Sequence, residues 1–441
     1  MVVEPLVVEA ADATDSTKNV SAALATATCA LLGVAPSVEA QESVWEVDAA
    51  LLYYGESDRV TAVEGVFSAK KDFGDEHIFS GKLVLDSLTG ASATGAVPQN
   101  SIQTFTRPSG NGQYQISAGE TPLDDTFKDT RLQLEAQWTQ PIWNDYRVSS
   151  GVHFSKEYDY LSLAANGSLA KDFNQKNTTL SAGVSLAFDT IDPEGGRPFA
   201  FSEMVIDQGQ FSDEAAYRVA FDATRQSGSD SKTIVDLLFG VTQVINRKML
   251  MQFNYGYSVS NGYQTDPFKV LSLVDTLGQT QSLLYENRPE KRTRHSIYWQ
   301  TKFATSLGVS DVSYRYATDN WDINSHTIDT RFRIKLSNNS YIQPHLRYYQ
   351  QSAANLYRPF LLEGAELLQY ASADYRLGEM TTYTLGLKYG MTLSSDNELA
   401  FRLEYYQQTP ENSGFAAPGI LQQQDLYPSL SAVIAQVSYS F

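Results

Sequence analysis

Segments in which apolar and polar residues alternate recur along most of this chain, and this repeated pattern restricts the fold more than any other feature. In the first segment, Trp45, Leu51 and Tyr53 would share one face of a strand. Glu46 and Asp48 would share the opposite face. Because successive side chains of a strand point to opposite faces, each segment has one apolar and one polar face. From there to the C-terminus, the segments predict about sixteen strands.

The connections between these segments alternate in length. Short polar links such as 71–76 and 171–176 alternate with longer excursions, which cover 87–128, 190–230, 259–293, 351–378 and 408–426. A soluble sandwich would bury one face of every strand in a shared core, and it would have no reason to sort loop lengths by side. A closed barrel in lipid pairs every backbone polar group and leaves no edge. We therefore predict an all-β, transmembrane, antiparallel up-and-down barrel with short periplasmic turns, long extracellular loops and both termini on the periplasmic side.

The C-terminal segment 432–441 reads AVIAQVSYSF and places Val433, Val437 and Phe441 on one face. An apolar face that ends on a terminal aromatic residue resembles the closing strand of Gram-negative outer-membrane barrels, which their insertion machinery reads. An ordinary half-buried strand would alternate in the same way. We expect this strand to lie beside 45–53, the apolar faces to contact outer-membrane lipid, and Phe441 to address the chain to the barrel-assembly machinery.

Composition supports a barrel and excludes two other classes. With 42 % hydrophobic residues and a mean hydropathy of -0.30, the chain has no run that suits a membrane-spanning helix beyond its N-terminal segment. The 26 tyrosines and 21 phenylalanines fit aromatic girdles at the two membrane interfaces. A net charge of -18 argues against nucleic acid as a partner, because a surface that binds phosphates must be basic.

Residues 1–40 are predicted to be an N-terminal extension plus a signal peptide, and residues 41–441 a single outer-membrane barrel domain. Lys18 precedes a run of small apolar residues, Val20–Val34, and a small-residue cleavage pattern follows. The single cysteine, Cys29, lies in this run, so the mature chain would contain none, as suits an oxidising compartment. A lipoprotein cysteine is the alternative. Acidic residues ahead of the run do not suit a basic n-region, which indicates a true start downstream or an unusually long n-region.

Five stretches carry distinctive motifs, among them TDPFK, YENRPEKRTRHS, DNWDINSHT, SYIQPHLRYYQQSA and YASADYRLG. They lie at Gly90–Pro98, Thr265–Ser296, Asp319–Thr327, Ser340–Tyr357 and Tyr370–Gly378. These stretches resemble a family of uncharacterised proteobacterial outer-membrane β-barrel proteins, a domain of unknown function, over nearly all of the mature chain. The resemblance implies an outer-membrane barrel without an established activity. It also implies an association with periplasmic redox and flavin-attaching proteins, and so a periplasmic redox partner.

Strand parity predicts which charged residues face the interior of the barrel. The interior set is mostly basic on the C-terminal half and more acidic on the N-terminal half. The predicted lumen-lining residues are Glu46, Asp48, Glu64, Asp86, Arg131, Glu135, Lys302, Arg315, Arg331, Arg333, Lys335, Arg347, Lys388 and Arg402. Two opposed walls of this kind would orient dipolar solutes and tune ion selectivity. Alternatively, the charges pair into salt bridges that fill and plug the interior.

Charged residues are also concentrated in the long loops and hairpin tips. Loops that fold into the mouth would bring these residues together as a constriction. The candidates are Asp266, Lys269, Arg288, Arg292, Asp319, Asp322, Asp374 and Arg376. A structural salt-bridge network that braces the loops is the alternative, and the residue types favour it over a ligand site.

Metal binding and cofactor binding are not predicted. Asp189, Asp192 and Glu194 offer oxygen ligands for a hard cation, but their spacing fits no calcium loop. The five histidines show no ligand spacing and have no cysteine companions, so His345 is expected to be a hydrogen-bonded lumen residue. We find no phosphate-binding glycine loop between a strand and a helix.

Three functions remain open. The leading hypothesis is a non-enzymatic, porin-like channel for small hydrophilic or charged solutes. The second is a plugged barrel with a structural or partner-docking role linked to a periplasmic redox system. The third is an outer-membrane hydrolase, because His153, Ser155 and Asn166 loosely resemble the arrangement in outer-membrane phospholipases. Parity directs these three side chains into the lumen, however, whereas a lipid-cleaving site should face the bilayer.

Overall fold

The structure is a computed structural model that describes residues 45–441, apart from residues 58, 367 and 394–396. The predicted signal peptide and Cys29 lie outside the described residues.

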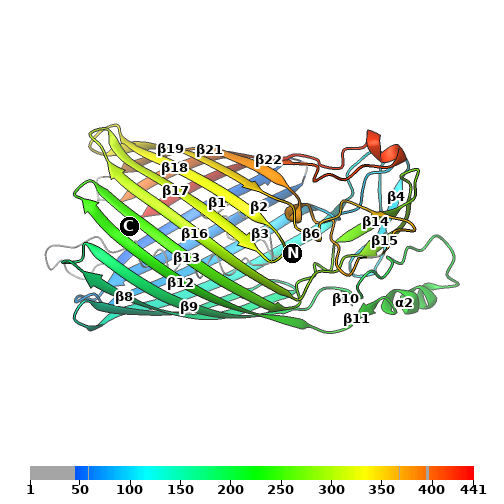
Figure 1. The fold of residues 1–441 in the computed structure, drawn as a ribbon, viewed down its shortest axis with the longest axis horizontal. Coiled ribbons are helices and arrows are strands. Elements are labelled where there is room, and N and C mark those ends of the chain that lie inside the picture. The colour runs from blue at the N-terminus through cyan, green and yellow to red at the C-terminus, as the bar shows by residue number, and fades with distance from the viewer. Residues whose placement is uncertain (1–44, 58, 367, 394–396) are drawn as a thin grey trace.

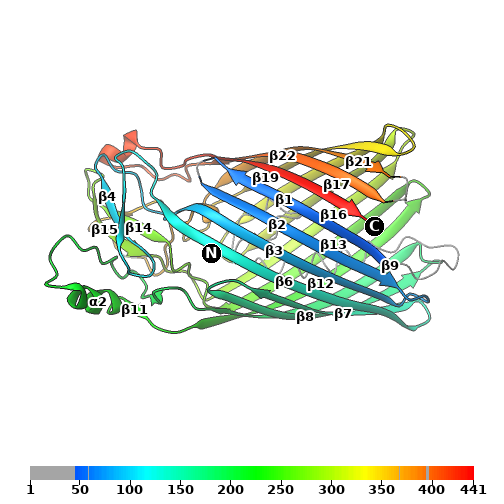
Figure 2. The same cartoon turned by 180° about the vertical axis from the view of Figure 1, so that it is seen from behind.

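Sixteen strands form one closed antiparallel barrel in which each strand pairs with its neighbours in chain order (Figure 1). The first strand, β1 (Trp45–Glu56), pairs with the last, β23 (Leu430–Ser440), and Leu51 lies opposite Val437. Figure 2 shows the blue β1 beside the red closing strand. The predicted barrel and its closure by the C-terminal strand are therefore confirmed. The remaining barrel strands are β2 (Val60–Asp72), β3 (Ile78–Ala93), β6 (Leu123–Trp143), β7 (Tyr146–Lys156), β8 (Tyr160–Phe173), β9 (Thr178–Ile191), β12 (Asp230–Asn246), β13 (Met249–Gly262), β16 (Lys291–Ala304), β17 (Gly308–Asp319), β18 (Asn324–Lys335), β19 (Ser340–Gln351), β21 (Met380–Thr392) and β22 (Glu398–Pro410).

The two faces of each strand differ in chemistry, as the alternation predicts. Large apolar side chains cover the outer surface, and Leu51, Leu385 and Leu403 are 60 %, 65 % and 60 % exposed. Leu52, the next residue on β1, is fully buried. An outer surface of this kind would cost much free energy in water but is stable against hydrocarbon, so the barrel spans a membrane. No helix in the described part of the chain is long and apolar enough to cross a membrane.

Loop lengths sort by side. The periplasmic links are short turns, such as 73–77 and 144–145, and Asp145 in the two-residue turn adopts a positive φ of 65°, which aspartate and asparagine tolerate better than most residues. On the extracellular side the links 157–159 and 320–323 are also short. The long extracellular loops span residues 94–122, 192–229, 263–290, 352–379 and 411–429.

These five long loops fold together over the extracellular end of the barrel, and we call the resulting layer the cap (Figure 1, right-hand end). Apolar side chains from different loops form its core, in which Phe105, Met204 and Val270 pack together. Because this core is built from several loops, the cap is a folded unit rather than a set of separate excursions. Its elements are β4 (Gln103–Thr106) with β5 (Gln113–Ile116), β10 (Arg197–Pro198) with β11 (Arg225–Gln226), helix α2 (Glu214–Asp222), the sheet of β14 (Val270–Val274), β15 (Thr280–Tyr285) and β20 (Leu361–Leu362), and the 3-10 turns η1 (Tyr375–Leu377) and η2 (Gly419–Gln423).

Candidate functional site

Loops of the cap contact one another across the extracellular mouth. The loop 94–122 starts at β3, and the loop 263–290 starts at β13, with β6, β7, β8, β9 and β12 between these two strands on the shorter way round the ring. Nevertheless, the Val270 backbone N–H donates to the Thr94 carbonyl at 2.9 Å, and the Val97 N–H donates to the Ser272 hydroxyl at 3.1 Å. The mouth is therefore bridged by hydrogen-bonded loops.

Six charged side chains meet where the loops 263–290 and 352–379 join, and we call them the loop charge cluster. The members are Asp266, Lys269, Glu286, Arg288, Asp374 and Arg376. Asp374, which is 1 % exposed, pairs with Arg288 at 2.7 Å and with Arg376, whose Nε lies 2.9 Å from the carboxylate. Arg376 also pairs with Asp266 at 2.8 Å, and Arg288 pairs with Glu286 at 2.6 Å.

Further contacts tie the loop charge cluster to the barrel and to the loop backbone. The Lys269 ammonium donates to the Ala93 carbonyl and lies 3.4 Å from the Ser92 hydroxyl, both at the extracellular end of β3. The Asp266 backbone N–H and the Ser372 hydroxyl donate to the Glu286 carboxylate. The cluster thus joins the two loops to each other and to β3.

Burial and ionic partners act in opposite directions on the pKa values of this cluster. Burial raises the pKa of the Asp374 carboxyl, but the guanidinium groups of Arg376 and Arg288 outweigh it and hold the pKa well below its usual range. The pKa of Asp266 is lowered for the same reason, by Lys269 and Arg376 acting against burial. Burial dominates at Glu286 and raises its pKa to about 7 although Arg288 opposes the shift.

The raised pKa of Glu286 predicts that the cap weakens as pH rises through neutrality. An unfolded glutamate ionises near its ordinary pKa of 4.5, whereas Glu286 in the cluster ionises near 7, so the stabilisation is complete below pH 4.5 and is lost progressively up to and through pH 7. This difference corresponds to about 3 kcal/mol. The lowered pKa values of Asp374 and Asp266 have the opposite effect. They stabilise the folded cap at neutral pH, and this stabilisation is lost only as the pH falls below their ordinary pKa of 3.8.

Hydrogen exchange of segments 263–290 and 352–379, corrected for intrinsic rates, should therefore show faster exchange at about pH 8 than at about pH 5. The variant Glu286→Gln keeps a neutral side chain of the same shape and should remove most of this pH dependence. An unchanged dependence in the variant would contradict the assignment to Glu286.

Arg292, Asp319 and Asp322, which were predicted to join the same constriction, form a separate group in which Arg292 of β16 meets the tip of the β17–β18 hairpin. Arg292 on β16 donates to Asp319 at 2.7 Å, and Asp319 accepts the backbone N–H groups of Trp321 at 2.9 Å and Ile323 at 3.0 Å. The Arg292 guanidinium lies over the Trp321 ring, and Asp322 is exposed. The eight candidates therefore form two groups, and whether either narrows a passage stays a prediction.

On the C-terminal half of the barrel, the predicted lumen residues have acidic neighbours on their own wall. Asp329 pairs with Arg347 at 2.7 Å and Arg331 at 3.4 Å, and Arg402 lies 3.9 Å from Glu404. The other pairs of this wall are Lys302 with Asp311 at 3.8 Å, Arg333 with Glu398 at 3.3 Å and Lys388 with Glu398 at 3.7 Å. Arg315 lies over the Tyr298 ring, and Lys335 is exposed at the periplasmic end of β18.

His345 links two carboxylates of this wall. Its Nε2 lies 2.8 Å from Asp329 and its Nδ1 lies 2.9 Å from Glu404. Ionised carboxylates only accept hydrogen bonds, so a ring held between two of them donates from both nitrogens and is protonated. A histidine used in this way has no free nitrogen for a metal.

The N-terminal half of the barrel shows the same sideways pairing. Arg131 on β6 pairs with Asp86 on β3 and lies 3.8 Å from Glu64 on β2. Glu135 lies 3.4 Å from His153. The last two predicted residues of this half lie near the periplasmic end, where Glu46 pairs with Lys70 at 3.3 Å and Asp48 accepts a hydrogen bond from Ser440 at 2.5 Å.

The weaker chemical candidates are not assembled into sites. His153 lies beside Glu135, and within the described residues no hydrogen bond joins it to Ser155. Asp189 pairs with Lys232 at 3.7 Å and accepts a hydrogen bond from Tyr160, whereas Asp192 and Glu194 are exposed. Asp189 is therefore buried against its own partners, whereas the other two candidate cation ligands face solvent.

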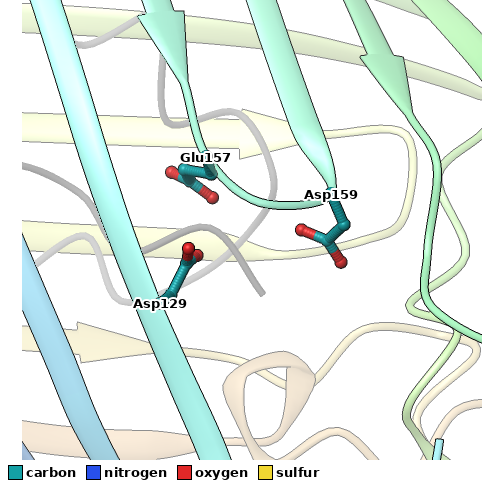
Figure 3. A group of neighbouring side chains, drawn as sticks. All are labelled: Asp129, Glu157 and Asp159. Carbon is teal, nitrogen blue, oxygen red and sulfur yellow. The ribbon is translucent and has the colours of Figure 1, made fainter. Parts of the chain in front are cut away.

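Sequence reasoning missed one acidic group at the extracellular rim. Asp129 on β6 meets Glu157 and Asp159 from the β7–β8 link, and one carboxylate oxygen of each lies within 4.8 Å of the others (Figure 3). The Tyr158 backbone N–H approaches Asp129 at 3.4 Å. The only signal in the sequence was the pair of acids around Tyr158 in a short link, because the third member comes from another strand.

The sequence from residue 21 to residue 441 matches the family described as "Protein of unknown function (DUF3570)". The chain belongs to this family. The resemblance inferred from the motifs is thereby confirmed. No curated protein matches the sequence.

Among solved structures, the family fold is similar to a bacterial polysaccharide outer membrane secretin, with 8 % identity over 91 % of this chain and 100 % of that one and a TM-score of 0.41. The toluene transporter TodX of Pseudomonas putida has 10 % identity over 91 % and 90 % of the two chains, with a TM-score of 0.36. The ferric enterobactin receptor of Pseudomonas aeruginosa, in complex with enterobactin, has 8 % identity over 90 % and 60 % and a TM-score of 0.42. Similarities this distant carry no conclusion about function.

Proposed function

We propose that this protein is a channel of the outer membrane of a Gram-negative bacterium and passes small hydrophilic or charged solutes without catalysing a reaction. The observation that carries the proposal is the direction in which interior charges pair. Arg347 pairs with Asp329 on the adjacent strand, and Arg131 pairs with Asp86 on the adjacent strand. Charges that are neutralised along the wall need no partner from the opposite wall, so the centre of a wide barrel is left to water.

The cap sets the conditions for passage. A solute that enters from outside must pass the bridged loops, so the cap acts as a filter or gate in front of the polar lumen. The loop charge cluster is the part of the cap that holds loops 263–290 and 352–379 to one another and to β3. A channel with such a cap would conduct less than its barrel width suggests.

Reconstitution of the purified protein in a planar bilayer tests this proposal. We expect stepwise conductance, because a lumen filled with water conducts ions once the barrel is inserted. A well-inserted barrel, recognised by its heat-modifiable migration on a gel, that stays electrically silent would contradict the proposal. A variant that lacks cap residues 264–289 should conduct more than the intact chain if the cap limits the current.

A second candidate is a closed barrel that docks a periplasmic partner, and the bridged mouth favours it. Backbone bonds such as Val270 to Thr94 join opposite parts of the rim and would hold the extracellular end shut. The family resemblance makes a periplasmic redox protein the partner to test. Stoichiometric co-purification of such a protein, together with a silent bilayer, would support docking over conduction.

A further inference from the structure

A row of polar residues crosses four neighbouring strands on the inner wall, in the extracellular half of the barrel. Asp236 on β12 lies directly opposite Ser185 on β9 and Ser258 on β13. Ser185 in turn lies opposite Asn166 on β8. Because directly paired residues point to the same face of a sheet, these four side chains form one patch, which we call the polar row.

Asp236 is a deeply buried inward carboxylate, and no cation of the described residues pairs with it. It is 3 % exposed, and Ser258 donates a hydrogen bond to it. Within the described residues, its Oδ1 and the Ser185 hydroxyl have no hydrogen-bond partner. Asp236 also interacts electrostatically with a second carboxylate, Asp189, and this interaction is repulsive when both are ionised. A buried carboxylate without a cation or a full set of donors costs several kcal/mol, so this oxygen is a ready acceptor for a positively charged group.

The next row toward the periplasm consists mostly of small residues. Gly183 on β9 and Gly256 on β13 flank Leu238 on β12, and Ser168 and Ser296 continue the row on either side. A Cβ at Gly256 would lie 2.6 Å from the Ser296 hydroxyl, so a larger residue there would require the serine side chain to rotate. We call this row of small residues around one leucine the shelf.

We propose that the polar row and the shelf bind a small organic amine, with its ammonium group on Asp236 and its carbon chain on Leu238. This proposal rests on the proposed channel function, because it names a class of solute that would pause inside the lumen. The Asp236 Oδ1 accepts one ammonium hydrogen, and the Ser185 hydroxyl on the neighbouring strand is placed to accept another.

The chemistry of the polar row selects an amine over two other classes. A neutral polyol would hydrogen-bond to the row but would leave the charge of Asp236 unmatched. A hard metal ion prefers several carboxylate or carbonyl oxygens, and the row supplies a single carboxylate. An ammonium group supplies both the opposite charge and three donors.

The test measures binding directly, by ligand-observed NMR titration of the full-length protein in detergent micelles. The probe is ethanolamine, and ethylene glycol serves as its neutral analogue. We expect ethanolamine to bind at least about tenfold more tightly than ethylene glycol, and Asp236→Asn to weaken ethanolamine binding at least about tenfold. Equal affinities for the two probes, or an unchanged affinity in Asp236→Asn, would overturn the proposal.

Asp311→Asn is the matched control, because Asp311 is an inward carboxylate that already has a cation, Lys302, 3.8 Å away. It should bind ethanolamine within about twofold of the unmodified protein. Asp236→Asn preserves side-chain shape, and heat-modifiable migration confirms that each variant is folded. Ser185→Ala offers a second, smaller loss of binding.

The two proposals fail separately. A protein that conducts ions but binds no amine would contradict the amine site and would leave the channel proposal unaffected. A protein that is electrically silent in the bilayer but binds ethanolamine through Asp236 would contradict the channel proposal and would support the amine site.

Discussion

The variant Asp374→Asn should release the cap, with the largest effect of any single change in the loops. Asp374 is the shared partner of Arg288 at 2.7 Å and of Arg376 at 2.5 Å, and all three side chains are largely removed from water. Removing one member of a buried ionic group leaves the remaining charges uncompensated, which costs about 3–5 kcal/mol. We expect that loss in the local stability of the cap while the barrel stays folded, because the strands do not depend on the cluster for their backbone bonds.

Hydrogen exchange resolved by peptide measures this effect, and segments 263–290 and 352–379 should lose protection together. In the bilayer, the same variant should raise the single-channel conductance if the cap filters solutes. The control is Asp192→Asn, at an exposed aspartate of the loop 192–229, which should change neither quantity. Full protection of both segments in Asp374→Asn would mean that apolar packing alone holds the cap.

The second large effect is expected for Leu385→Arg on the outer face of β21. Leu385 is 65 % exposed, and its neighbours across the two adjacent strands are Leu346 and Tyr405. An arginine on the lipid face near the middle of a membrane strand costs about 2–4 kcal/mol, because its charge leaves water for hydrocarbon. Urea unfolding in lipid vesicles should show a loss of this size.

A matched leucine in the cap separates lipid from water as the cause. Leu277 is 62 % exposed in the turn between β14 and β15, so Leu277→Arg makes the same substitution at almost the same exposure. In water the change should be nearly neutral, within about 0.5 kcal/mol. Equal losses at both positions would argue that the outer surface of the barrel does not contact hydrocarbon.

The barrel was predictable because its strongest determinant is local. The alternation of Trp45 with Glu46 and Asp48 shows within a few residues which face is apolar, and the same kind of signal recurs along the chain. Short polar links such as 71–76 were readable from residue type. The pairing of β1 with β23 followed from closure, since a barrel has no edge and its last strand must meet its first.

The cap and the charge partners were not predictable to the same extent. Parity identifies the face of Asp329, but its bond to His345 depends on register, and the bond from His345 to Glu404 reaches over the intervening strand β21. The loops carry no periodic signal, so the meeting of Val97 with Ser272 across the mouth depends on three-dimensional contacts alone. The surroundings of Asp236, with Ser258 and Asp189 near its carboxylate, appear only when the neighbouring strands are in place.

The way in which the cap is joined also sets a sequence of events for maturation. The Ile420 backbone N–H donates to the Leu277 carbonyl at 2.8 Å, so a segment just ahead of the final strand completes a unit that begins near Thr94. A nascent chain cannot form this unit until its last hairpin has arrived, however early its other loops emerge. The loops should therefore become resistant to an external protease only after the last hairpin has folded. Such resistance would indicate that the barrel has closed.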